Sequence, residues 1–184
     1  VVMGKEESTT DYFPLTVDYE ERFYAAGKIL GSRFVRREGR PSEEAVLSGR
    51  VIDRTIRPLF DQRVRRNVQV VITILEIDDE NDPDFIALLT ASAAIGLSPV
   101  PWNGPVAGLR IFSDGEKITL NPTNSEVRVS WPRERAFHGF VSGTAERINM
   151  IELEGIDAKE DDFVAAASEA HKEIKRLIGW QKKI

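Results

Sequence analysis

Apolar residues recur along the chain with two spacings, and each spacing predicts one kind of element. Helical spacing predicts helices over residues 43–57, 83–97 and 159–183. Alternating or β-branched runs predict strands near residues 12–19, 68–77, 104–112, 116–120, 126–131, 137–142 and 147–153, and residues 1–3 look like the end of another strand. Because helices and strands are interspersed, we expect one α/β or α+β domain in which a mixed β-sheet packs against helices.

Three of these segments carry further information. Residues 68–77 are almost continuously apolar and β-branched, which is typical of a strand buried on both faces. Pro14 lies in the strand predicted over residues 12–19 and favours an edge position or a bulge there. The helix over residues 83–97 has small and mostly uncharged side chains, so we expect it to pack centrally against a sheet. Residues 4–10 are polar and predict a loop.

The first predicted helix has a clear beginning and end. Ser42 can cap its first turn by accepting a hydrogen bond from a free amide. Pro58 is expected to end it, because proline lacks an amide donor and disfavours a helical conformation at the preceding residue. Arg50, Arg54 and Arg57 fall on one face, within an arc of roughly 60°. The remaining faces are largely apolar, so these three arginines form a stripe beside a buried surface.

Arginine is concentrated around this stripe. Residues 33–66 contain ten of the seventeen arginines and no lysine, and they carry a net charge of +5 in a chain of net charge −5. In one interpretation, carboxylates such as those of Asp53 or Glu38 pair with the stripe and serve the structure. In the other, a phosphate or polyphosphate ligand binds, because a planar guanidinium grips phosphate through two hydrogen bonds. The use of arginine at every cationic position favours the second interpretation.

Composition argues against several kinds of site. The chain has no cysteine, so disulfides and thiolate metal ligands are excluded. His138 and His171 are far apart in sequence, and a histidine metal centre or a Ser-His-Asp triad is not expected. The acidic residues 78–84 lack the pattern of a calcium loop, and helix capping explains them better. No apolar run could span a membrane and no signal peptide is visible, so we expect a soluble, cytoplasmic protein without a membrane partner.

An aromatic residue adjoins the arginines before the first predicted helix. Phe34 and Val35 precede Arg36 and Arg37 in a segment flanked by glycines. A ring beside two guanidinium groups suits single-stranded RNA, because a base stacks on the ring while phosphates meet the charges. Phe34 could equally anchor the core. No nucleophile with an accompanying base is visible, so the chain shows residues suited to binding rather than to catalysis.

Five segments follow one another in the order YFPLTVDYEERFYAAGKI, RFVRREGRPSEEAVLSGRVIDRTIRPLF, VQVVITILEIDDENDPDFIALLTASAAIGLS, PWNGPVAGLRI and FVSGTAERINMIELE. This order closely resembles the first ribonuclease-PH-like domain of the bacterial polynucleotide phosphorylases. The resemblance implies a ribonuclease-PH-like fold and a homotrimeric ring that degrades RNA, including mRNA, from its 3′ end. It also implies inorganic phosphate as co-substrate, nucleoside diphosphates as products, and magnesium as cofactor.

The resemblance further implies roles for particular residues. The loop Phe34, Val35, Arg36 and Arg37 matches the family motif that lines the aperture through which RNA is threaded. The arginines that match the family's RNA-facing and phosphate-facing positions are Arg40, Arg50, Arg54 and Arg57. The stripe found from helical spacing therefore consists of the same residues.

The resemblance also divides the chain. Residues 1–157 match the first ribonuclease-PH-like domain without its opening strands, and residues 158–184 match the start of an all-helical linker. The family's catalytic residues and magnesium site lie in a second such domain, so we expect no catalytic or metal-binding residue here and no activity of the chain alone. A non-catalytic RNA-binding or ring-assembly module is the alternative. A binder of small phosphorylated metabolites is a third interpretation.

Overall fold

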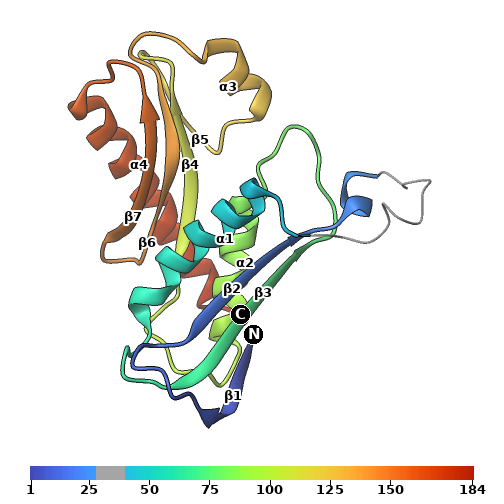
Figure 1. Ribbon diagram of the computed structural model, residues 1–184. Coiled ribbons are helices and arrows are strands. Elements are labelled where there is room, and N and C mark those ends of the chain that lie inside the picture. The colour runs from blue at the N-terminus through green and yellow to red at the C-terminus, as the bar shows by residue number, and fades with distance from the viewer. Residues whose placement is uncertain (28–39) are drawn as a thin grey trace.

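The computed structural model describes residues 1–27 and 40–184 (Figure 1). The strands are β1 (Val2–Glu7), β2 (Leu15–Glu21), β3 (Arg66–Ile74), β4 (Ala107–Ser113), β5 (Ile118–Leu120), β6 (Phe137–Gly143) and β7 (Ile148–Gly155). The helices are α1 (Glu43–Ile56), α2 (Asp84–Gly96), α3 (Asn124–Ser130) and α4 (Glu160–Gln181), with 3-10 turns at Phe23–Ala26 and Arg57–Leu59. Helices and strands are interspersed, which confirms the expected α/β (α+β) class.

The first sheet is mixed and has the strand order β1-β3-β2. β1 runs antiparallel to β3, and β2 runs parallel to it. β2 is therefore an edge strand, as Pro14 immediately before it predicted. β1 continues to Glu7, so the prediction of a loop from Gly4 onward is wrong over its first four residues.

The prediction that the β3 segment is buried on both faces is wrong. Val68, Val70 and Ile72 are buried, whereas Val71 between them is 46% exposed. The buried residues share one core with α1 and α2, and these helices cover only one face of this sheet. The β-branched run therefore reflects strand propensity, which does not require a cover on both faces.

The second sheet is antiparallel throughout and has the order β5-β4-β6-β7. β4 and β5 are joined by the predicted turn, in which Gly115 has a φ of 94° that favours glycine. The strand predicted over residues 126–131 is wrong, because this segment forms α3. Thr123 and Glu126 make a capping box there, and these reciprocal hydrogen bonds favour a helix over the β-propensity of the valines that follow.

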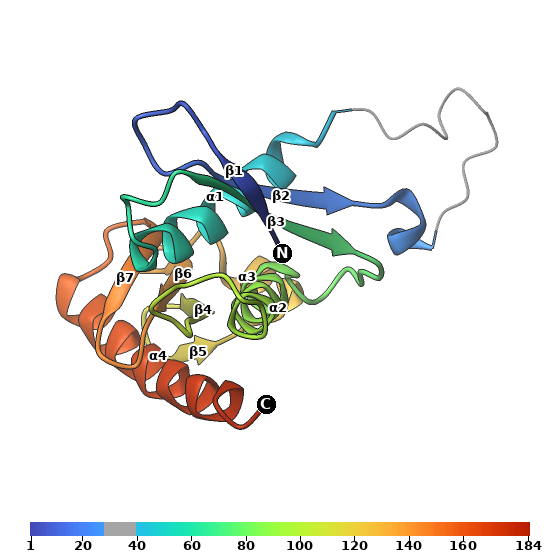
Figure 2. The same cartoon turned by 90° about the horizontal axis from the view of Figure 1, so that it is seen from below.

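Helix α2 lies between the two sheets (Figure 2). One side of it contributes Leu88 and Ile95 to the core shared with β3 and α1. The other side contributes Phe85 and Leu89 to a second core with the antiparallel sheet and α4. The central position predicted from its small side chains is confirmed, and the helix joins both cores into one body.

Helix α4 packs on the face of the antiparallel sheet that carries Leu109 and Val141. Its end meets α2, where Ser92 Oγ donates to Gln181 Oε1 at 2.7 Å. Its buried residues Ala166, Ala170 and Ile174 continue the second core, so α4 packs on the same body as the strands before it. The division between a first domain, residues 1–157, and a helical linker from residue 158 stays a prediction. Within residues 1–27 and 40–184, none of the helices combines the length and apolar content needed to cross a membrane.

Candidate functional site

Helix α1 forms where the sequence predicts a helix. Ser42 Oγ accepts a hydrogen bond from the backbone N–H of Ala45 at 3.0 Å, so the predicted N-cap is confirmed. The prediction that Pro58 moves Arg57 out of the helical conformation is wrong, since Arg57 has a φ of −53° and a ψ of −43°. A 3-10 turn accommodates the proline directly after α1, and the stripe extends through Arg57.

A groove of about 380 Å³ runs between α1 and the edge of β2 opposite β3, which pairs with no strand of the described residues. Arg50, Asp53 and Arg57 line it from the helix, and Asp18 and Glu20 line it from the strand. Its charge is therefore mixed, with the cations on the helix side only.

Four hydrogen bonds hold the guanidinium of Arg57. Its Nε donates to Asp53 Oδ2 at 3.0 Å, and its Nη2 donates to Asp53 Oδ1 at 2.7 Å. The Nη1 group donates to the carbonyl of Phe13 at 3.3 Å, and Nη2 also donates to the carbonyl of Leu15 at 3.1 Å. Because a guanidinium has five N–H donors, one is left over. The interpretation of an internal ion pair therefore describes Arg57.

The other arginines of the stripe have different surroundings. Arg50 and Arg54 are exposed, and neither side chain makes a hydrogen bond or ion pair within residues 1–27 and 40–184. The exposed Arg40, which precedes α1, is equally without a partner in that part of the chain. The loop Phe34, Val35, Arg36 and Arg37 lies outside the described residues, so its predicted role remains untested. Within the described part of the chain, Arg50 and Arg54 are thus the stripe residues whose charge no side chain neutralises.

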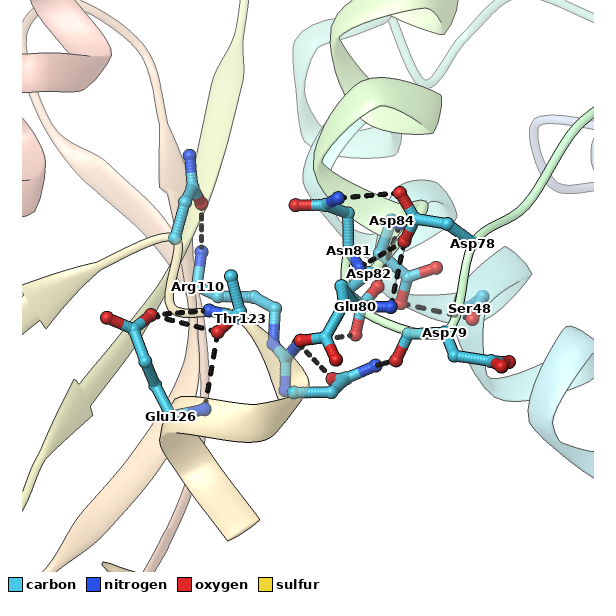
Figure 3. A network of polar contacts seen from close by, with 12 residues as sticks. Ser48, Asp78, Asp79, Glu80, Asn81, Asp82, Asp84, Arg110, Thr123 and Glu126 are labelled. Atoms are coloured by element: carbon cyan, nitrogen blue, oxygen red, sulfur yellow. Dashed lines mark hydrogen bonds and ion pairs between the residues drawn. The ribbon is translucent and has the colours of Figure 1, made fainter. Parts of the chain in front are cut away.

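Helix α1 is also fixed on the sides away from the groove. Ser48 Oγ donates to Asp84 Oδ2 at 3.0 Å, which ties α1 to the first turn of α2 (Figure 3). Near the end of α1, the hydroxyls of Thr55 and Ser142 share a hydrogen bond of 2.7 Å, and both residues are fully buried. Asn149 Nδ2 donates to the carbonyl of Thr55 at 3.0 Å. Both cores and these polar contacts therefore set the direction in which the arginines project.

The carboxyl group of Asp84 is perturbed by its position between α1 and α2. Its pKa is raised to about 6, chiefly by burial and in addition by the nearby charge of Asp82, while the hydrogen bond from Ser48 acts in the opposite direction. One of its oxygens, Oδ1, is buried and has no hydrogen-bond partner. No local sequence pattern indicates this contact, because Ser48 and Asp84 come together only in the folded chain.

The acidic segment over residues 78–84 satisfies its own backbone (Figure 3). Asp78 Oδ1 accepts hydrogen bonds from the amides of Glu80 and Asn81 at 2.8 and 2.6 Å, and Asp82 pairs with Arg110 at 3.3 Å. Among the residues that the structure describes, no group of three or more His, Cys, Asp or Glu could hold a metal ion. The described residues therefore do not fit a magnesium site, and the magnesium implied by the resemblance stays a prediction.

The model of one protein family matches this chain. The first domain of the 3′ exoribonuclease family, named RNase PH, matches residues 1–101, which is more than half of the chain. The chain belongs to the 3′ exoribonuclease family. The matched region contains α1 with its arginine stripe, β2 and the whole mixed sheet. The ribonuclease-PH-like fold expected from the sequence is confirmed by this match.

Several relatives of this exoribonuclease-family chain are named polyribonucleotide nucleotidyltransferase. The protein of Thermomicrobium roseum is 47% identical over 171 residues, which cover 93% of this chain and 21% of that protein. The protein of Heliobacterium modesticaldum is 42% identical and that of Thermus thermophilus 45% identical, with 95% and 94% of this chain and 24% and 23% of those proteins covered. The chain thus spans less than a quarter of the length of these three relatives.

A solved structure shows the same fold at a much larger sequence distance. Rrp46 of rice (Oryza sativa) superposes with a TM-score of 0.69 at 11% identity, over 97% of this chain and 76% of that chain. At this identity the similarity shows the fold alone.

Proposed function

We propose that this exoribonuclease-family chain is the RNA-binding half of a phosphate-dependent 3′–5′ exoribonuclease. In this reaction inorganic phosphate attacks the last phosphodiester bond of the RNA. The 3′ oxygen of the preceding nucleotide leaves and takes up a proton, and a nucleoside diphosphate is released. The support comes from relatives at 42–47% identity that are named polyribonucleotide nucleotidyltransferase, together with the exposed arginines of α1.

One observation carries the RNA-binding part of this proposal. Arg50 and Arg54 lie one turn apart on α1, are exposed, and have no partner within the described part of the chain. A guanidinium keeps its charge at every physiological pH, so it attracts an anion from outside the chain. Two such groups about 6 Å apart along a helix suit successive phosphates of one strand.

The chain would supply binding but no acid, base or nucleophile. In the proposed enzyme, magnesium, inorganic phosphate and the bond-breaking residues are held by the part of the longer relatives that this chain does not cover. A homotrimeric ring in the cytoplasm that takes part in mRNA degradation is the setting we propose. The loop Phe34, Val35, Arg36 and Arg37 and the neighbouring Arg40 would contact RNA at the entrance.

The salt dependence of RNA binding tests the proposal. A double variant, Arg50→Gln with Arg54→Gln, should weaken binding of oligo(A) and lower the slope of log K against log salt concentration by about 1.4, since each phosphate contact on a single strand contributes about 0.7. Arg128→Gln is a matched control, because Arg128 is exposed on α3 and has no partner within residues 1–27 and 40–184. It should leave the slope unchanged. An unchanged slope in the double variant would contradict the proposal.

A non-catalytic RNA-binding or ring-assembly module is the alternative. Phosphate-dependent release of nucleoside diphosphates from oligo(A) distinguishes the two. The proposal expects no release by the 184-residue chain and release once the remaining part of a longer relative is present. A binder of small phosphorylated metabolites would instead bind a nucleotide that oligo(A) fails to displace.

A further inference from the structure

Within the arginine stripe, Arg57 differs from Arg50 and Arg54 because its guanidinium is bound by other groups of the chain. Arg57 uses four of its five N–H donors within the chain, and two of them go to the carboxylate of Asp53. In this bidentate pair the carboxylate of Asp53 offsets the positive charge of the Arg57 guanidinium. Arg57 therefore lacks the free charge and the two parallel free donors that a bidentate phosphate contact needs.

The two carbonyls that Arg57 binds lie at the start of β2: one belongs to Leu15, its first residue, and the other to Phe13, which also accepts a hydrogen bond from the amide of Leu15 at 3.0 Å. The carbonyl of Pro14 accepts a hydrogen bond from the amide of Val68 on β3 at 2.9 Å. Because carbonyls alternate in direction along an extended strand, those of Phe13 and Leu15 point to the opposite edge. Arg57 reaches them there, at 3.3 and 3.1 Å. Its side chain consequently fastens the end of α1 to the edge of β2.

The same attachment bears on the exposed arginines. Arg50 lines the groove together with Asp53 and Arg57, so the three side chains share one wall. If the end of α1 moved away from β2, the distance across the groove and the direction of Arg50 would both change. Phe13 is 2% and Leu15 8% exposed, so the carbonyls that anchor Arg57 belong to residues of the buried core.

We propose that Asp53 and Arg57 are positioning residues, which fasten α1 to the edge of β2 so that Arg50 and Arg54 project toward the RNA, and that Arg57 does not itself contact RNA. This inference rests on the proposed function. It separates the stripe into two arginines that bind RNA and a third, Arg57, that holds the helix together with Asp53.

The sign of one charge change provides the sharpest test. Asp53→Asn removes a negative charge from the groove, and electrostatics alone would then strengthen binding of oligo(A). The positioning role predicts weaker binding, because the carboxylate that holds Arg57 is lost. Asp18→Asn is the matched control, since Asp18 also lines the groove and accepts its hydrogen bond from Gln69 instead of from an arginine. It should strengthen binding or leave it unchanged. Tighter binding by Asp53→Asn would overturn the inference.

Variants at Arg57 test its lack of direct contact. Arg57→Gln should lower the melting temperature by about 4–8 °C and weaken binding of oligo(A), measured well below that temperature, without changing the salt slope. Arg54→Gln should lower the slope by about 0.7 and leave the melting temperature unchanged. Arg57→Lys should behave like Arg57→Gln, because an ammonium cannot reproduce the planar fork.

Each other outcome is decisive. A slope lowered by about 0.7 in Arg57→Gln, and restored in Arg57→Lys, would show a phosphate contact and overturn the inference. If Arg57→Gln lowers the melting temperature but leaves the affinity for oligo(A) unchanged, Arg57 contributes only to stability, and its positioning role is overturned. If the unmodified chain does not bind oligo(A), the proposed function is overturned, and with it the positioning role. This result is obtained before any variant is made, so it is distinguished from a failure of the positioning role alone.

Discussion

Arg54 and Arg57 lie on the same face of α1, less than one turn apart, and yet their surroundings are opposite. Arg57 is bound by Asp53 and by two carbonyls of the preceding chain, whereas Arg54 is exposed and has no partner within residues 1–27 and 40–184. Helical spacing determines which face a residue occupies, but the elements packed against that face determine whether its charge is available. One stripe can therefore combine attachment and recognition.

Removing the bound arginine should change stability more than any other substitution considered. Arg57→Ala should lower the free energy of unfolding by about 2 kcal/mol, because four hydrogen bonds are lost and the carboxylate of Asp53, which is 24% exposed, is left without its cation. Arg54→Ala should change it by less than about 0.5 kcal/mol. Urea denaturation measures both. Equal effects of the two changes would show that the comparison between the residues is wrong.

A second effect is the pH dependence of stability caused by Asp84, which holds α1 on the side away from the groove. Because the pKa of Asp84 is raised to about 6 in the folded chain, the folded state keeps a proton that the unfolded state loses near its ordinary value. Stability therefore falls as pH rises from about 4 to about 6, by an amount on the order of 2 kcal/mol. Asp84→Asn should remove this fall.

The difference between the two proteins is the quantity to measure, by urea denaturation across this pH range. Exposed carboxyls whose pKa is lowered, such as Asp78 and Asp114, change stability in the opposite direction in both proteins and cancel in the difference. A difference that does not vary with pH would contradict the assignment to Asp84.

A smaller effect is expected at the contact between α1 and α2. Ser48→Ala removes the donor to Asp84 Oδ2, and Asp84 Oδ1 already lacks a partner. We expect the free energy of unfolding at neutral pH to fall by about 1 kcal/mol. Since the lost hydrogen bond holds the pKa of Asp84 down, the pH-dependent fall should also extend to higher pH. Asp84→Asn combined with Ser48→Ala should show no such extension.

The smallest effect tests how Arg54 would grip a phosphate. Arg54→Lys keeps the charge, so the salt slope for oligo(A) should stay the same. The ammonium lacks the two parallel donors of a guanidinium, so affinity should fall about two- to fivefold. Arg57→Lys, in comparison, should lower stability as well. A fall in stability in Arg54→Lys would indicate that Arg54 has a structural partner.

Local signals in the sequence predicted much of the fold. The N-cap at Ser42, the turn around Gly115 and the small side chains of α2 each depend on neighbouring residues, and all three predictions are confirmed. The errors arose where two local signals disagreed or where the partner is distant. The capping box at Thr123 decided for a helix against β-branched residues, and the exposure of Val71 depends on which faces the helices cover.

In the candidate site too, local contacts were predictable from the sequence and distant ones were not. The period of the helix brought three arginines onto one face, and the spacing of four residues between Asp53 and Arg57 is itself a sign of an ion pair. The carbonyls of Phe13 and Leu15 precede Arg57 by more than forty residues along the chain, so no local pattern indicates them. For that reason the sequence could name Asp53 as a candidate partner but could not decide which arginine it would take.

The free edge of β2 has one more consequence. An uncovered edge strand offers its backbone to any extended peptide, and such pairing leads to aggregation. Here α1 lies along that edge, and the guanidinium of Arg57 occupies the carbonyl of Leu15 at the start of β2 and that of Phe13 just before it. These carbonyls are then not open to the amides of a strand from another molecule.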